Sequence, residues 1–247
     1  MSSRDKSDEA DSSIVIARRS SDYSRKTDAA TSDTEKIATL SSLARNDTLK
    51  MQSILFDVPF TSQAPLRDWD NVIFQQACEE AAMLMAMLWV EGKEFISKED
   101  AEKAILEISD FEKKNYRYFE DTSAQDTAII MKDYFNYTNI EAKYDVSREH
   151  IKRELLNGNL VIVPVNGQKL SNPFYTPPGP LRHMILVVGY DAETKEFITN
   201  DAGTRRGEGF RYKENIFESA IQDYVTGYKE PIVQVRSAMI VVRRISS

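Results

Sequence analysis

Apolar residues fill almost every position from Ala81 to Val90, a run built mainly of Ala, Met and Leu. These residue types favour helices, and a helix that is apolar nearly all round its circumference is buried. The pattern therefore predicts a central buried helix, with Gly92 as its C-cap. The only cysteine of the chain, Cys78, then lies in the first turn of this helix.

Helical patterns come first along the chain and strand patterns mostly later. Helices are predicted near residues 97–108, 123–135, 147–158 and 213–224. Apolar, β-branched runs predict strands near residues 54–60, 160–165, 184–188, 197–199, 210–212, 232–235 and 239–242. Because the two kinds of element are segregated and do not alternate, the sequence predicts an α+β fold.

The first fifty residues differ in composition from the rest. Residues 1–50 are rich in Ser, Asp, Lys, Arg and Thr, and their one apolar cluster is Ile14 to Ala17. Such a segment buries too little apolar surface to offset the entropy lost on ordering. We expect residues 1–50 to form a disordered or weakly helical N-terminal tail and residues 51–247 to form one folded domain.

The net charge of −7 argues against a general nucleic-acid binder and against binding to anionic membranes. No apolar run approaches the roughly 20 residues that a membrane span needs. A single cysteine allows no intrachain disulfide, and Met1 to Arg25 lacks a secretory signal. As given, the chain is expected to be cytoplasmic, or secreted if an upstream signal has been removed.

Cys78 has the position of a nucleophile. The unpaired N–H groups and the dipole at a helix N-terminus favour a negative charge, and they lower the pKa of a thiol from about 8.5. The alternative is that Cys78 is a small buried apolar side chain, as unpaired cysteines often are. The residues that can act with a thiolate decide between these interpretations.

The chain has two histidines. His150 lies in a charged helical segment, so we predict that it is on a solvated helix surface. His183 opens the buried strand 184–188 after a Pro/Gly-rich loop, and loops at strand ends are where functional groups concentrate. Two histidines and one cysteine far apart in sequence do not match zinc-ligand spacing, so neither a metal nor another cofactor is expected.

Asp201 is the expected partner of His183. If strand 184–188 and the strand ending at Asn200 pair as a hairpin, His183 and Asp201 lie at the same open end. The carboxylate can then accept the Nδ1 proton of the imidazole and fix its tautomer. Asn200 is the second candidate, although strand alternation turns it to the other face. Asp201 could instead be a turn residue in the sequence Asn-Asp-Ala-Gly.

Acyl transfer to a thiolate also needs hydrogen-bond donors for the developing oxyanion. The backbone N–H of Cys78 is one expected donor. A side-chain amide is the other, from Gln63, Gln75 or Gln76.

The order of a Gln, a Cys heading a buried helix, a His opening a strand and an Asp ending the next strand resembles the papain superfamily. Within it, the chain is most similar to bacterial peptidases related to those that trim bacteriocin leader peptides. The resemblance spans residues 54–243 and is carried by the segments 58–63, 76–81, 183–191 and 198–204. It implies a papain-like fold in which a helical subdomain faces an antiparallel β subdomain, with the active site in the cleft between them.

The resemblance also implies roles for four residues. Cys78 matches the nucleophile, His183 the base, Asp201 the acid that orients the base, and Gln63 the amide of the oxyanion site. The implied reaction is hydrolysis of an amide bond in a peptide or protein substrate through a covalent acyl-enzyme.

The sequence departs from the leader-trimming peptidases at two places. Glu79 stands where those enzymes usually have Gly, and it would raise the pKa of the thiol if it pointed inward. The interval from Gln63 to Cys78 is also longer, with 65–77 as an insertion. These departures motivate a second hypothesis, a non-catalytic module that binds a peptide in the cleft.

Overall fold

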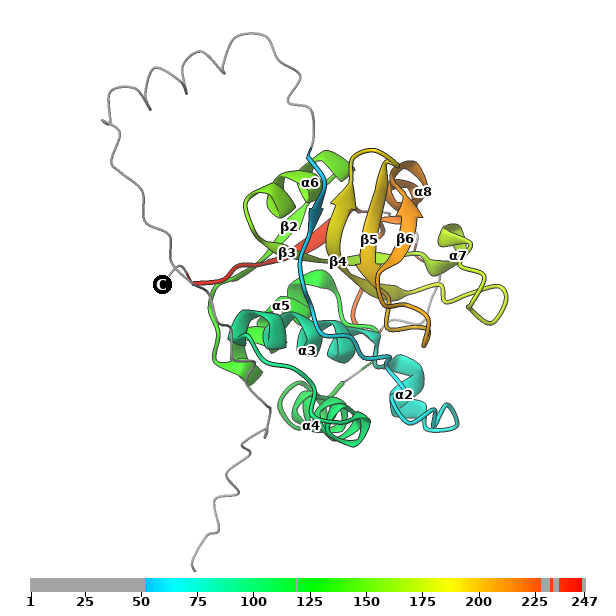
Figure 1. Ribbon diagram of the computed structural model, residues 1–247. Coiled ribbons are helices and arrows are strands. Elements are labelled where there is room, and N and C mark those ends of the chain that lie inside the picture. The colour runs from blue at the N-terminus through cyan, green and yellow to red at the C-terminus, as the bar shows by residue number, and fades with distance from the viewer. Residues whose placement is uncertain (1–51, 119, 228–231, 233–235, 246–247) are drawn as a thin grey trace, which may run out of the picture.

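The computed structural model describes residues 52–118, 120–227, 232 and 236–245 of the chain (Figure 1). The predicted tail at residues 1–50 lies outside these residues, so the tail and the domain boundary near residue 51 stay predictions. Within the described residues, every helix is too short or too polar to span a lipid bilayer.

A seven-stranded antiparallel sheet forms the centre of the described chain. The strands follow the order β2-β7-β3-β4-β5-β6, and β1 pairs with β4 beside this path. Their bounds are Ile54–Leu55 (β1), Ile140–Tyr144 (β2), Leu160–Val165 (β3), His183–Asp191 (β4), Glu196–Asn200 (β5), Phe210–Lys213 (β6) and Ala238–Val242 (β7). Strands β3 and β4 are buried along almost their whole length, as continuous apolar runs predict.

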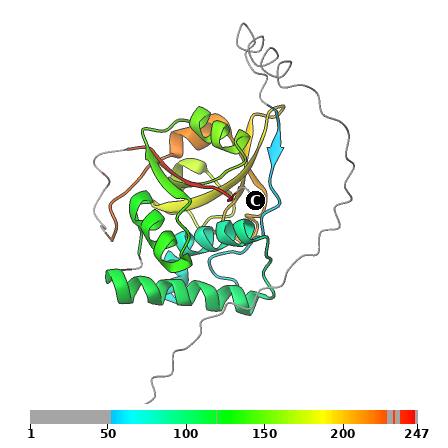
Figure 2. The ribbon, with the colours of Figure 1, turned by 90° about the vertical axis from the view of Figure 1, so that its left-hand side faces the viewer.

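Helices cover both faces of the sheet (Figures 1 and 2). In β3, Leu160 and Ile162 belong to the core of α3, α4 and α5, whereas Val161 and Val163 belong to the core of α6 and α8. The helices are α2 (Val72–Gln76), α3 (Cys78–Glu91), α4 (Lys98–Tyr116), α5 (Ala124–Phe135), α6 (Arg148–Leu156), α7 (Gly167–Leu170) and α8 (Glu214–Ala220). The arrangement confirms the α+β class.

Helix α3 is the central buried helix that the apolar run predicts. All its residues from Cys78 to Trp89 are buried, and the helix packs against β4. Gly92 caps it with φ of 65°, a conformation that Gly adopts without steric cost. The Cys78 thiol interacts with the backbone of Met184, so the N-terminus of α3 lies near the start of β4.

Three predicted elements differ in extent. The strand predicted at 54–60 is only Ile54–Leu55, because the side-chain amide of Asn200 bonds to the carbonyls of Val58 and Pro59 in place of a neighbouring strand. The helix predicted at 97–108 continues to Tyr116. The helix predicted at 213–224 ends at Ala220, because the next residues turn back to bond β3.

Other short elements escaped the sequence pattern. Strand β2 alternates apolar and charged residues but is only five residues long, and α2 is a five-residue helix too short to show a helical period. In the strand predicted at 232–235, Ile232 is not in a strand and the other three residues lie outside the described chain.

Two buried carboxyl groups pack between helices without hydrogen-bond partners among the described residues. They belong to Glu80 of α3 and Glu112 of α4. Burial, with a further contribution from the charge of Glu79, raises the pKa of Glu112 from 4.5 to about 9. An acid with a raised pKa binds more protons when folded than when unfolded, so its contribution to stability falls as the pH rises from the unfolded to the folded pKa.

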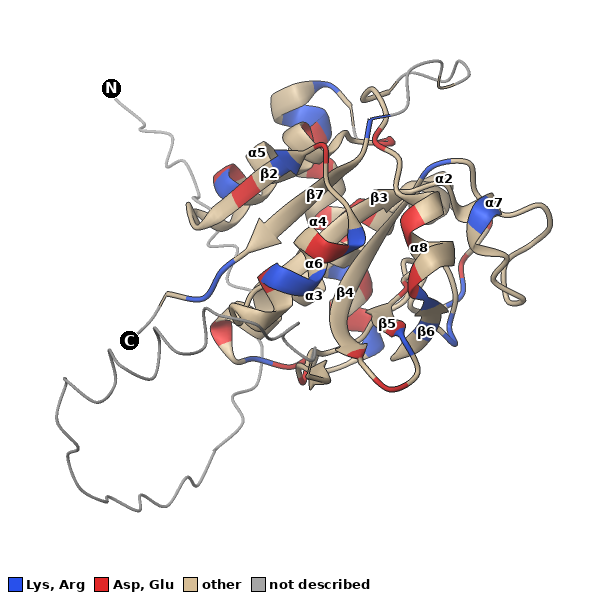
Figure 3. Cartoon of the chain, turned by 90° about the horizontal axis from the view of Figure 1, so that it is seen from above, with Lys and Arg blue, Asp and Glu red and all other residues tan. Residues whose placement is uncertain are grey.

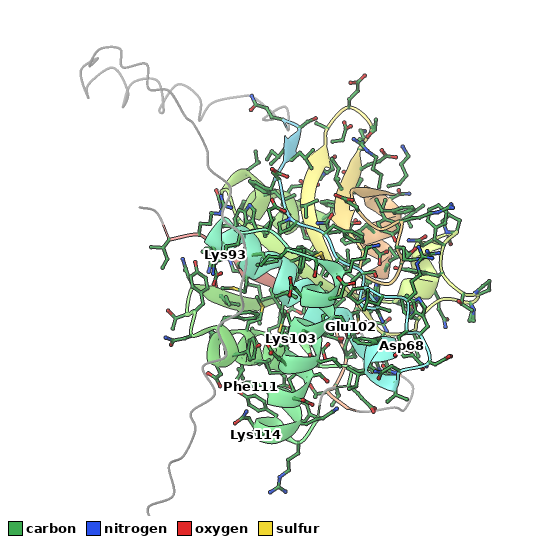
Figure 4. All side chains as sticks on the ribbon, turned by 60° about the horizontal axis from the view of Figure 1, so that its bottom comes forward. Asp68, Lys93, Glu102, Lys103, Phe111 and Lys114 are labelled. Carbon is green, nitrogen blue, oxygen red and sulfur yellow. The ribbon has the colours of Figure 1, made fainter. Side chains whose placement is uncertain are left out.

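Glu112→Gln is expected to raise the free energy of unfolding at pH 8 and to change it little at pH 4. The difference from the wild type should grow with pH by at most about 1.4 kcal/mol per unit. Urea unfolding at several pH values measures it. Glu107→Gln is the matched control, because Glu107 lies on the same helix and pairs with Lys103, whose exposed side chain is labelled in Figure 4. A difference that does not vary with pH would contradict the expectation.

Candidate active site

Cys78 begins α3 directly after Ala77, which joins it to α2. Its side chain is 5% exposed. The thiol donates a hydrogen bond to Glu79 Oε2 at 2.9 Å. The other oxygen of that carboxyl group, Oε1, accepts a hydrogen bond from the hydroxyl of Tyr224 at 2.7 Å. The Glu79 carboxyl group therefore links the Cys78 thiol to the Tyr224 hydroxyl in a buried chain of hydrogen bonds.

The pKa of the Cys78 thiol is raised well above its ordinary value. Burial is the largest cause, and the charges of Glu79 and Asp121 add to it, whereas the backbone of Met184 acts in the opposite direction. The helix N-terminus predicted a lowered thiol pKa. That prediction is wrong for this arrangement, because the thiol is buried and the side chain of Glu79 points at the sulfur.

The charge on Glu79 changes near neutral pH. Burial is the main cause of a pKa raised from 4.5 to about 7; the hydrogen bonds from Cys78 and Tyr224 oppose it, and the charge of Asp121 supports it. The carboxyl group is neutral below this pH and negative above it. The electrostatic environment of the sulfur therefore depends on pH within the physiological range.

His183 begins β4 opposite Val165 of β3, and Asp201 directly follows β5. The β4–β5 pairing brings the two side chains together, with His183 Nε2 2.8 Å from Asp201 Oδ1. The sequence predicted this pair with Nδ1 facing the carboxylate. That detail is wrong, because Nε2 faces it in the structure. Because Nε2 faces Asp201, Nδ1 is the ring nitrogen left for another partner.

Asp201 is fully buried and surrounded by donors. In addition to its contact with His183, the Asp201 carboxylate accepts hydrogen bonds from the hydroxyls of Tyr175 and Tyr212, both at 2.6 Å, and from the backbone N–H of Gly203. Burial on its own would raise the pKa of this carboxyl group, but His183 and the two hydroxyls outweigh it, so the pKa is lowered. Asp201 is therefore ionised and holds the imidazole in one orientation.

Gln63 lies between the two halves of the site. Its side-chain amide donates a hydrogen bond to the carbonyl of Phe74 at 2.8 Å, and its backbone N–H donates to the carbonyl of Ala202 at 2.9 Å. Phe74 belongs to α2, which leads into Cys78, and Ala202 follows Asp201. The loop of Gln63 thus joins the helical segment that holds the cysteine to the turn that holds the aspartate.

The other candidates lie elsewhere. Gln75 is exposed and its side-chain amide donates to the carbonyl of Trp69, and among the described residues the side chain of Gln76 has no hydrogen-bond partner. Asn200 Oδ1 accepts a hydrogen bond from Gly209, so its amide organises loops on both sides of β5. His150 is exposed and its Nδ1 caps the start of α6, as predicted for a helix surface.

In the described part of the chain, no hydrogen bond joins the Cys78 thiol to the His183 imidazole. The thiol interacts with the backbone of Met184, the residue after His183. Its proton is directed at Glu79 instead. The sulfur therefore lies near the start of β4, the strand that His183 opens, and its hydrogen bond goes to Glu79.

Sequence reasoning missed the residues that surround the pair and the thiol. Tyr175, Tyr212 and Asn172 meet at Asp201, and Tyr224 meets Glu79. They come from segments up to 145 positions from their partners, and no local pattern marks them. Within the described residues, no three His, Cys, Asp or Glu side chains are arranged to hold a metal ion.

Known proteins share this fold. The model of the Peptidase_C39 like family matches residues 55–230. The crystal structure of a protein from Bacillus anthracis, assigned to the C39-like peptidases, matches with a TM-score of 0.51 and 14% identity, covering 79% of this chain and 100% of that chain. That identity supports a shared fold alone. No curated protein matches.

The family match covers well over half of the chain, and the structure has the helices and antiparallel sheet of its structural neighbour. Membership in this family suggests peptidase activity. The chain belongs to the Peptidase_C39-like family of papain-like cysteine peptidases.

Proposed function

We propose that the protein hydrolyses peptide bonds, with Cys78 as nucleophile, His183 as base and Asp201 as the residue that orients His183. The observation that carries the proposal is the buried His183–Asp201 pair, joined at 2.8 Å, with the next residue of the same strand in contact with the thiol. A base fixed by a carboxylate beside a nucleophile is the arrangement that covalent catalysis requires.

The reaction begins when the Cys78 thiol exchanges its hydrogen bond to Glu79 for one to Nδ1 of His183. The imidazole takes the thiol proton and the sulfur attacks the substrate carbonyl carbon. The backbone N–H of Cys78 and the Gln63 amide then donate hydrogen bonds to the oxyanion. Gln63 uses only one amide hydrogen for Phe74 and keeps the other for this purpose.

Protonated His183 next gives its proton to the nitrogen of the leaving amine, and the peptide bond breaks to leave a thioester on Cys78. A water molecule, deprotonated by His183, attacks the thioester carbonyl and releases the acid. Asp201 stays ionised throughout and stabilises the imidazolium that forms in each half of the reaction.

One observation favours a second function, peptide binding without hydrolysis. The thiol donates its hydrogen bond to Glu79, and its pKa is raised. In a binding module this pair would be a permanent buried contact, and the sulfur would not react.

A peptide that carries an electrophile distinguishes the two functions. We expect a peptidyl acyloxymethyl ketone to add once to Cys78, seen as one mass shift of the intact protein and located by peptide mapping. His183→Gln should slow this addition strongly while the protein stays folded. A wild-type protein that binds the peptide part reversibly but forms no adduct would support the binding module.

A further inference from the structure

Two adjoining pockets open beside the catalytic pair. They have volumes of about 520 and 500 Å³ and share two lining residues, Arg205 and Arg206. We call them the loop pocket, which Ser62 and Arg67 also line, and the aromatic pocket, which Trp69 also lines.

Both pockets adjoin residues of the proposed active site. Ser62 of the loop pocket directly precedes Gln63. Gly203 forms part of the aromatic pocket, and a Cβ atom added there would lie 2.9 Å from His183 Cε1. A substrate held by the proposed nucleophile and base would therefore place its neighbouring side chains in or near these two pockets.

The pockets are basic although the chain carries a net charge of −7. Arg67, Lys98, Arg205 and Arg206 line them, against the single carboxylate of Glu208. Basic segments border β6 in Figure 3.

The four pocket cations differ from the basic residues on β6. Arg211 pairs with Asp191 and Glu196, and Lys213 pairs with Glu196. In the described part of the chain, none of the four pocket cations has an ion pair.

The loop that carries Arg205 and Arg206 is held in place. The backbone N–H of Arg206 donates to the Thr204 hydroxyl at 3.2 Å, and that of Asp201 donates to the carbonyl of Gly207 at 3.0 Å. A Cβ at Gly207 would lie 1.8 Å from the Asp201 carbonyl oxygen, so only Gly fits. The Arg206 guanidinium also lies 4.8 Å from the centre of the Phe174 ring.

We infer that the two pockets bind acidic side chains of the substrate, so that the protein acts on peptides with Asp or Glu within a residue or two of the scissile bond. A guanidinium forms paired hydrogen bonds with a carboxylate, and such bonds are stronger than neutral ones. The aromatic walls of Trp69 and Phe174 contact the aliphatic part of the same side chains. This inference rests on the proposed function for its placement beside the scissile bond.

Three quenched fluorescent peptides of one scaffold test it, with Glu, Gln or Lys on both sides of the cleaved bond. We expect kcat/KM for the Glu peptide to exceed that for the Gln peptide about tenfold, and to exceed that for the Lys peptide by a larger factor. The preference for the Glu peptide should weaken as the salt concentration rises. Arg205→Gln/Arg206→Gln should remove most of the preference without slowing alkylation of Cys78 by iodoacetamide.

Arg211→Gln/Lys213→Gln is the matched control, because it removes two positive charges from the nearby strand β6 and should keep the preference. Equal kcat/KM for the three peptides, or an unchanged preference in the Arg205/Arg206 variant, would overturn the inference. If none of the peptides is cleaved, the proposed function fails. Fluorescence anisotropy with the Cys78→Ala protein then tests the pockets alone: tighter binding of the Glu peptide supports them, and equal binding refutes them.

Discussion

Replacing Cys78 by Ala is expected to abolish peptide hydrolysis and to leave the fold intact. Losing the nucleophile of the Ser-His-Asp triad lowers kcat by about 10⁶-fold in a serine protease, and a comparable loss here would leave a rate undetectable in a fluorescent peptide assay. Labelling by iodoacetamide should disappear as well, because the chain has no other cysteine. Circular dichroism and a thermal melt check the fold.

Cys78→Ser provides the control for packing. Its hydroxyl keeps a donor for Glu79 Oε2, so the melting temperature should stay close to that of the wild type while hydrolysis is lost. Hydrolysis that survives in either variant would mean that Cys78 is not the nucleophile.

The second large effect concerns the charge beside the sulfur. We expect Glu79→Gln to accelerate alkylation of Cys78 at pH 8 by about tenfold for each unit by which the thiol pKa falls. The Glu79 carboxyl is negative above its pKa of about 7 and then opposes formation of a second negative charge on Cys78. A Gln amide has nearly the same shape and no charge, and it can donate a hydrogen bond to the thiolate.

The pKa of Glu79 also determines how the effect of Glu79→Gln on the alkylation rate changes with pH. Below pH 7 the wild-type carboxyl is already neutral, so the two proteins should react at similar rates; above it they should diverge. The measurement is the rate of iodoacetamide reaction from pH 5.5 to 9, followed by intact mass. Parallel profiles in the two proteins would show that Glu79 does not control the thiol.

Tyr224→Phe is a matched variant on the other side of the carboxyl group. The Tyr224 hydroxyl lowers the pKa of Glu79 by donating to it. Without this hydroxyl, Glu79 should stay neutral to higher pH. The alkylation rate of Tyr224→Phe should therefore fall below that of Glu79→Gln only at a higher pH than the rate of the wild-type protein does.

The sequence predicts the His183–Asp201 pair because a hairpin with a short turn leaves few ways to arrange two strand ends. Strand β4 begins at His183 and β5 ends one residue before Asp201, and the observed register makes them neighbours. The hydrophobic pattern of the sequence could not predict which nitrogen of the His183 ring faces the Asp201 carboxylate. It depends on the orientation of the imidazole, which packs against Tyr175 from the loop before β4 and against Gly203 from the turn after β5.

The environment of Cys78 was harder to predict. A buried helix and a cysteine in its first turn are both visible in the run that starts at Cys78. The direction of Glu79 depends on Tyr224, which reaches it from a segment after α8, and sequence periodicity carries no information about such a contact. Local patterns therefore located the sulfur and missed its hydrogen-bond partner.

The segment from Phe56 to Gln63 has a mechanical consequence. It is tied to β4 by the Phe56 amide, to the Asn200 side chain by the carbonyl of Val58, and to the turn after β5 by the Gln63 amide. The Gln63 side-chain amide fastens the same segment to α2 through the carbonyl of Phe74. Moving α2 away from the sheet would therefore have to break either this bond or the bonds to the sheet, so the segment resists separation of the two.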